Sequence, residues 1–324
     1  MTRGVAAAIT ALIVGAGFSG PGIVGAGLTG PGIVRAGSTG PGIVGAGFSR
    51  PFVSAQQLPN EPFRQFGTSV TGAFEGWFAA PDGTRYFLIG YLNRNNNQAV
   101  DVAIGPNNHI DPGGPDMGQP SHFLPGRHWG MFVIKVPAEF TGPDQRLTWT
   151  IVANGQSTVI PLRLHPDYSV SPFTDVAVKN TPPTLRFAEQ GPGVQGPLGS
   201  IATAVTRTAR VGAPLAVSVW TEDDAKFASG TMAPPKNLPP PVRVFWSMFR
   251  GPAAVTFDKE NPTNEVLAGG ALNQPFRGKS TVSATFKEPG DYVLNVTAND
   301  YSGEGGSGEV CCWTTSLVKV TVTP

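Results

Sequence analysis

Apolar and polar residues alternate in short runs along most of the chain, and turn-forming residues separate these runs. In the first half, the alternation predicts strands over 69–78, 86–93, 99–104, 130–136, 147–153 and 157–164. In the second half, it predicts strands over 209–220, 242–248, 254–257, 280–286, 291–299 and 316–322. We identify no amphipathic helix period, so the pattern predicts an all-β protein.

Turn signals and composition divide the chain into domains. Pro81-Asp82-Gly83-Thr84 and Asn154-Gly155 lie between predicted strands and favour tight turns. Residues 166–199 are rich in Pro and Gly, and we interpret them as an extended linker. We therefore predict one β-sandwich domain over 56–165 and a second over 200–324.

The first 55 residues have a composition of their own. A ten-residue unit of the type VGAGFSGPGI is repeated over 14–53, and the last copy is degenerate. Arg3 and the apolar run 5–14 precede the repeats, and the small residues 53–55 follow them. This order is typical of a secretory signal peptide, so we predict that 1–55 is removed on export. The alternative is a retained, flexible elastin-like arm, because Gly and Pro favour recurrent turns.

Charge and composition narrow the possible partners and location. The chain has 23 Lys and Arg against 22 Asp and Glu, and its formal net charge is +1. This balance provides no general attraction for nucleic acid or an anionic membrane. We expect no nucleic acid partner and no transmembrane anchor in the mature chain. The predicted location is secreted, periplasmic or at the cell surface.

The second predicted domain resembles a known family. Its residues 244–257 contain FWS and RGPAAVTF, and 284–300 read ATFKEPGDYVLNVTAND. These segments resemble PKD-type Ig-like domains of bacterial exported proteins. The resemblance implies an Ig-like sandwich with Trp246 in its core and a spacer or adhesion role. Tyr292 also suits a tyrosine corner, in which the phenol bonds to the main chain. The Pro-rich insert 225–241 departs from the family pattern. The fold expectation is thus two Ig-like β-sandwich domains in tandem.

Potential metal ligands are concentrated in one Gly/Pro-rich loop. They are His109, Asp111, Asp116, His122 and His128. Imidazole nitrogens and carboxylate oxygens can hold zinc or a similar ion. The spacing matches no established ligand motif, so the preferred interpretation is a polar loop held by turns, with no cofactor.

A second group of acids surrounds the end of the predicted strands of the second domain. Its members are Glu222, Asp223, Asp224, Asp300, Glu304 and Glu309. Loops at one end of a sandwich can converge such carboxylates on Ca²⁺, which takes oxygen ligands. Solvated loop acids are the other interpretation.

The only two cysteines are adjacent, Cys311 and Cys312. Successive strand residues point to opposite faces, so the first interpretation is one buried and one exposed thiol. The second is a vicinal disulfide formed in an oxidising compartment, and the third is a metal-binding pair.

No nucleophile elbow, zincin helix, phosphate loop or dinucleotide fingerprint is present in the sequence. We predict an exported, non-catalytic binding or spacer protein of the bacterial envelope, with a protein or carbohydrate partner at the cell surface. One alternative is a metal-dependent enzyme that uses the loop His109–His128. Another is a subunit of an extracellular structural assembly, formed by pairing of strand edges.

Overall fold

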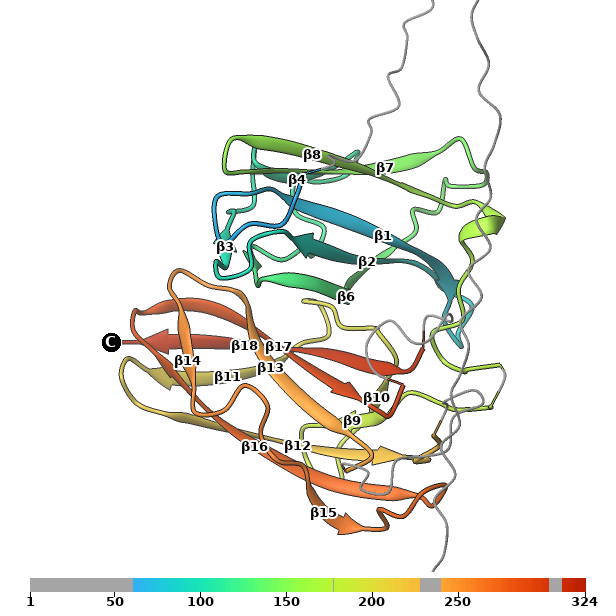
Figure 1. Cartoon of the computed structure of the whole chain (residues 1–324), viewed down its shortest axis with the longest axis vertical. Helices are drawn as coiled ribbons and strands as arrows, with labels where there is room; N and C mark the ends of the chain where they lie inside the picture. The colour runs from blue at the N-terminus through green and yellow to red at the C-terminus, as the bar shows by residue number, and fades with distance from the viewer. Residues whose placement is uncertain (1–60, 177, 228–239, 303–310) are drawn as a thin grey trace, which may run out of the picture. The chain divides into compact units, whose positions relative to one another are not determined.

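The computed structural model describes residues 61–324, apart from residues 177, 228–239 and 303–310 (Figure 1). The predicted signal peptide with its repeats, and most of the Pro-rich insert, lie outside these residues. Within the described chain, the single helical element is the short 3₁₀ helix η1 (Pro166–Tyr168), and the fold is all-β as predicted. No helix of the described chain is long and apolar enough to cross a membrane.

The first sandwich is built from three small sheets, ordered β1-β2-β6, β4-β7-β8 and β3-β5. Its strands are β1 (Val70–Ala79), β2 (Arg85–Asn93), β3 (Val100–Asp101), β4 (Asn108–Asp111), β5 (His122–Phe123), β6 (Gly126–Lys135), β7 (Arg146–Ala153) and β8 (Gln156–Arg163) (Figure 1). The core contains the buried rings of Phe87, Phe132 and Trp149.

The two predicted turns of this sandwich are confirmed. Asn154 and Gly155 both have positive φ values, 51° and 75°, and join β7 to β8. This is the mirror-image turn whose twist matches that of paired strands, and Asn-Gly is its preferred sequence. Gly83, with φ 81°, occupies the positive-φ position between β1 and β2.

The second sandwich consists of a sheet ordered β10-β9-β12-β16-β14, with β15 also on β16, and a sheet ordered β11-β18-β17-β13. Its strands are β9 (Thr184–Arg186), β10 (Val194–Gln195), β11 (Val205–Arg210), β12 (Leu215–Asp223), β13 (Arg243–Arg250), β14 (Val255–Phe257), β15 (Glu265–Ala268), β16 (Phe276–Phe286), β17 (Gly290–Asn299) and β18 (Trp313–Thr323) (Figure 1). The pair β11 and β18 is parallel.

Two boundaries differ from the sequence expectation. Strands β9 and β10 lie inside 166–199, the expected linker, and β9 pairs with β12. The second sheet therefore begins before residue 200. The single strand expected over 209–220 is two strands, because the chain turns at Gly212, with φ 73°, between β11 and β12.

The features that carried the family resemblance have core positions. Trp246 on β13 is 2% exposed and packs among the apolar side chains between the two sheets. The Tyr292 hydroxyl donates a 2.9 Å hydrogen bond to the main-chain oxygen of Glu288, which is the expected tyrosine corner.

The two sandwiches are packed against each other within one compact unit, residues 54–324. Trp313, the first residue of β18, is 0% exposed and packs with Phe78, Leu88 and Val133 of the first sandwich. Gly130 makes this contact possible, because a Cβ atom there would lie 2.5 Å from the indole ring.

Two further side chains of the second sandwich, Phe249 and Leu317, belong to the buried cluster of the first. The sheet β11-β18-β17-β13 is therefore covered on both faces. This explains why β18 is buried almost continuously from Trp313 to Val318 instead of in alternation.

Candidate functional site

The five predicted metal ligands take part in separate contacts. His109 and Asp111 are two positions apart on β4, and His109 Nε2 lies 3.2 Å from Asp111 Oδ2. His122 on β5 faces Asp101 on β3, with 2.7 Å between Nδ1 and Oδ1. The structure therefore pairs these residues locally and does not bring the two histidines to one ion.

His128, the third histidine of the loop, is packed against neighbouring residues. His128 stacks on Tyr91, with 4.9 Å between ring centroids, and its Nε2 lies 3.0 Å from the main-chain oxygen of Pro125. Burial lowers the pKa of His128 below its ordinary value of 6.5. The imidazole is thus held neutral in a packed position.

Asp116, the last member of the predicted ligand set, joins the two sandwiches. Arg250 on β13 donates two 2.8 Å hydrogen bonds, one to each oxygen of Asp116. These bonds are the main reason that the pKa of Asp116 is lowered. Sequence analysis did not identify this contact, because nothing local connects residues 134 positions apart. Among the described residues, no three His, Cys, Asp or Glu side chains could hold a metal ion.

Protonation of His128 should therefore oppose folding. Its folded-state pKa is depressed, so below the ordinary value of 6.5 the unfolded chain binds the proton more readily. The contribution of His128 to stability is therefore expected to be lost as the pH drops from about 7 to about 5, and the difference in stability between the wild type and His128→Phe should change over this range. Chemical denaturation at several pH values measures the effect.

His165→Phe, at a more exposed histidine, serves as the control for this experiment. It should retain the wild-type pH profile. A His128→Phe profile that matches the wild type would show that another group is responsible.

The second predicted group, the acids at one end of the second sandwich, contains two buried carboxylates. Asp223 is 8% exposed and Asp300 is 5% exposed. Burial, followed by repulsion from Asp300, raises the pKa of Asp223 to about 8. Burial also raises the pKa of Asp300 to about 6. The two carboxyl groups therefore repel each other when both are ionised.

Their neighbours in sequence are neutralised by cations. Lys226 Nζ lies 3.2 Å from Asp224 Oδ2. Glu222 pairs with Arg186 and, more loosely, with Arg277, at 2.8 and 3.4 Å. Glu304 and Glu309 lie outside the described residues. The structure thus separates the four acids that it describes into two compensated surface residues, Glu222 and Asp224, and a buried pair, Asp223 and Asp300.

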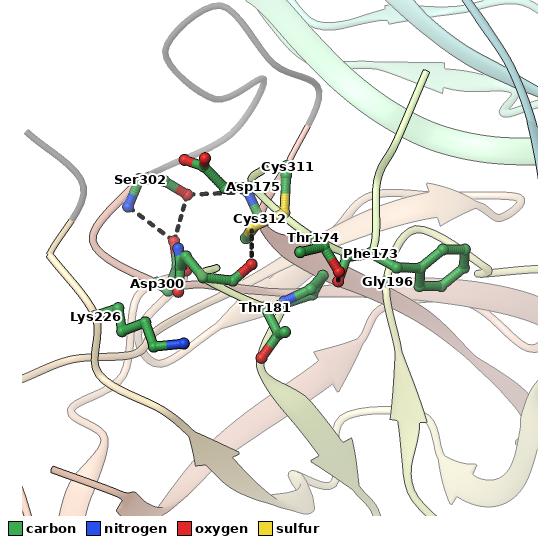
Figure 2. Close-up of a disulfide and its surroundings, with 12 residues drawn as sticks. Phe173, Thr174, Asp175, Thr181, Gly196, Lys226, Asp300, Ser302, Cys311 and Cys312 are labelled. Atoms are coloured by element: carbon green, nitrogen blue, oxygen red, sulfur yellow. Dashed lines mark hydrogen bonds between the residues drawn. A yellow bond between two sulfur atoms is a disulfide. The ribbon is translucent and has the colours of Figure 1, made fainter. Parts of the chain in front are cut away.

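The two cysteines lie close to Asp300, one member of this buried pair, and form a disulfide (Figure 2). Both are buried, so the expectation of one buried and one exposed thiol is wrong. The main-chain N–H of Cys312 donates a 2.9 Å hydrogen bond to Ser302 Oγ, and that hydroxyl donates to Asp300 Oδ1 (Figure 2). Cys312 Sγ lies 3.6 Å from the main-chain oxygen of Asn180, a packing contact because a disulfide sulfur carries no proton.

A surface groove of about 400 Å³ is the other concave feature of interest. Tyr86 and Phe173 supply aromatic walls, and Gln195, Ser200 and Thr203 supply polar groups. Apolar walls with a few polar groups are typical of ligand sites.

Comparisons with known proteins assign the chain to no family. No family model matches the chain. No curated protein matches it either. Domains 4 and 5 of the S-layer protein SbsC are 11% identical, with 79% of this chain and 98% of theirs covered, at a TM-score of 0.18. The sialic acid binding region of the Streptococcus sanguinis SK1 adhesin, bound to 3'sLn, is 12% identical, with 79% and 78% covered, at a TM-score of 0.20. Scores this low do not establish a common fold, so the sandwich assignment rests on the strand pairing described above.

Proposed function

We propose that the protein is an exported, non-catalytic binding or spacer protein of the bacterial envelope or extracellular space. The observation that carries the proposal is the disulfide between Cys311 and Cys312. Disulfides persist in oxidising compartments and are rare in the cytosol. The basic residue, apolar run and small residues of 1–55 independently support export.

The packing between the sandwiches supports a spacer role. Trp313 packs with side chains of the first sandwich, and the Arg250–Asp116 pair joins the two sandwiches at the other end of β17. A packed contact of this kind restrains the hinge motion that is otherwise usual between domains. We further propose that the second sandwich is a PKD-type domain, which the positions of Trp246 and Tyr292 support.

The binding role requires a partner, for which we propose a protein or carbohydrate at the cell surface. The groove beside Tyr86 and Phe173 is a place on the described surface that suits such a partner. Glycan and peptide arrays probed with the purified protein test this, with Tyr86→Ala as the matched variant. Binding that survives Tyr86→Ala would place the partner elsewhere.

Export predicts a mature chain that begins at Gln56 and carries no free thiol. N-terminal sequencing of the exported protein should give Gln56, because residues 53–55 have the small side chains that signal peptidase requires. Alkylation of the unfolded, unreduced protein should label neither cysteine. A chain that starts at Met1, or two labelled thiols, would contradict the proposal.

A second candidate function is a subunit of an extracellular assembly, which strand β15 favours. All four residues of β15 are exposed, and they include the aliphatic side chains of Val266 and Leu267. An exposed apolar edge strand can pair with a strand of another molecule. Size-exclusion chromatography and electron microscopy distinguish this function, because a spacer remains monomeric.

A further inference from the structure

The inward-facing rows of β12 and β17 both end in an aspartate. On β12 the buried alternate positions are Val217, Val219, Thr221 and Asp223. On β17 they are Leu294, Val296 and Ala298, and the next inward position after the strand is Asp300. Because alternate residues of a strand share one face, each carboxylate continues a row that faces the core.

One segment of chain connects the two rows at the same end of the sandwich. Asn180 Nδ2 donates a 2.5 Å hydrogen bond to Asp300 Oδ2. The next residue, Thr181, donates a 3.2 Å hydrogen bond to Asp224, which directly follows Asp223. Residues 180–181 therefore contact both strand ends, and the repulsion between Asp223 and Asp300 indicates that the two carboxylates, which follow the rows of opposite sheets, lie near each other (Figure 2 shows Asp300 and Thr181).

The buried pair has no compensating cation in the described chain. No Lys, Arg or His forms an ion pair with Asp223 or Asp300 there, whereas the adjacent Asp224 is paired with Lys226. Leaving ionised groups buried without a partner is costly. Some other positive species is needed if both carboxylates are charged.

Two buried oxygen atoms at this place have no hydrogen-bond partner in the described chain. They are Asp223 Oδ1 and Asn180 Oδ1, and Asn180 is 0% exposed. An unsatisfied buried acceptor loses its hydration without gaining a partner, so it is uncommon in a native structure without a ligand. Both unpaired atoms are oxygens. One belongs to the Asp223 carboxylate, and the other belongs to the amide that donates to Asp300.

We propose that this end of the second sandwich binds one Ca²⁺ ion through Asp223, Asp300 and the side-chain oxygen of Asn180. Hard oxygen donors of this type suit Ca²⁺, and main-chain oxygens and water complete its coordination. The absence of a third His, Cys, Asp or Glu at the described site is compatible with Ca²⁺, whose ligands include amide oxygens and water. The two cysteine sulfur atoms nearby are bonded to each other, so they supply no thiolate ligand for a soft metal.

Two carboxylates place the affinity at the weak end of the range for Ca²⁺. We expect a Kd of about 0.1–1 mM, the range of extracellular Ca²⁺ modules. A shared proton is the competing occupant, because a carboxyl pair can be neutralised by protonation of one member. If Ca²⁺ occupies the site, added Ca²⁺ raises the unfolding temperature. If a proton neutralises the pair, added Ca²⁺ leaves the unfolding temperature unchanged.

Thermal unfolding and calorimetry of the full chain test the proposal, with Ca²⁺ alone as the probe. The chain is first treated with a chelator, and Ca²⁺ is then added to about 10 mM at neutral pH. We expect one ion per chain, an unfolding temperature that rises with Ca²⁺ concentration, and tighter binding at higher pH because protons are displaced. Equal Mg²⁺ should have a smaller effect, because Mg²⁺ gives up its water reluctantly.

Isosteric variants assign the site. Asp223→Asn and Asp300→Asn should each weaken Ca²⁺ binding roughly tenfold or more, because ligand charge sets the affinity. In chelator both variants should be at least as stable as the wild type, because a buried amide carries no charge that burial penalises. Asp291→Asn, at an exposed aspartate of the same sandwich, should bind Ca²⁺ as the wild type does.

Two results would overturn the proposal. One is a wild-type unfolding temperature that does not respond to Ca²⁺, in which case a proton neutralises the pair. The other is an equal response in the wild type and in both Asn variants, in which case Ca²⁺ acts elsewhere on the chain.

Discussion

Replacement of Trp246 by Ala should lower the free energy of unfolding by about 3–5 kcal/mol. The indole ring is 2% exposed and lies in the cluster between the two sheets of the second sandwich. Removal of a ring from such a position loses its transfer free energy and leaves a cavity that the surrounding strands fill only in part. Denaturant titration of the purified variant gives the difference directly.

Trp246→Phe is the matched control. It retains an aromatic ring and removes the indole N–H, which is buried without a hydrogen-bond partner in the described chain. The loss should therefore be clearly smaller than for Trp246→Ala. An alanine variant that unfolds like the wild type but no longer binds a ligand would show that Trp246 acts as a binding platform.

Replacement of Trp313 by Ala should destabilise the protein by a similar amount, about 3–5 kcal/mol, and also uncouple the two sandwiches. Trp313 belongs to β18 of the second sandwich, but its ring packs with Phe78, Leu88 and Val133 of the first. Loss of the ring removes the largest fully buried side chain from this contact. Differential scanning calorimetry should show one transition for the wild type and two for the variant.

Gly130→Ala should disturb the same contact through a residue of the first sandwich. Its Cβ atom would lie 2.5 Å from the Trp313 ring, so the variant should also separate the transitions. Trp220→Ala is the control, because this partly exposed ring lies on β12 outside the Trp313 cluster, with Lys279 Nζ 5.1 Å from its centroid. Unchanged single transitions for Trp313→Ala and Gly130→Ala would show that other contacts couple the sandwiches.

The long strands were predictable because each one carries its own signal. Predicted strand 291–299 corresponds to β17 (Gly290–Asn299), and 86–93 corresponds to β2 (Arg85–Asn93). In both, enough successive residues alternate for the period to be visible. Strands β9 and β10 have three and two residues, which is too short for any period. Only their pairing in space defines them.

Burial on both faces also obscured part of the pattern. Thr314, Thr315 and Ser316 are polar but buried, because β18 lies between the core of its own sandwich and the first sandwich. Sequence reasoning treats such residues as exposed positions. The packing of one domain on the other is a tertiary property that no local pattern records.

The acidic site shows where sequence reasoning stopped. Asp223 and Asp300 were both among the candidate acids, and each has the parity of the apolar residues in its strand. That parity is a signal of burial that could have separated them from Glu222 and Asp224. Asn180 could not be predicted, because it lies 120 positions from Asp300 in a segment expected to be a linker.

Strand β18 also affects the order in which the protein can fold. It pairs with β11 and β17, which both precede it in the chain, and Thr315 reaches Gly130, 185 positions earlier. Until β18 is placed, β11 has no neighbour in its sheet and β17 has one open edge. Closure of such large loops is slow, and unpaired edges invite aggregation while they persist. The proposed export would benefit from the same delay, because translocation requires an unfolded chain and the sheet stays incomplete until the last of its strands is placed.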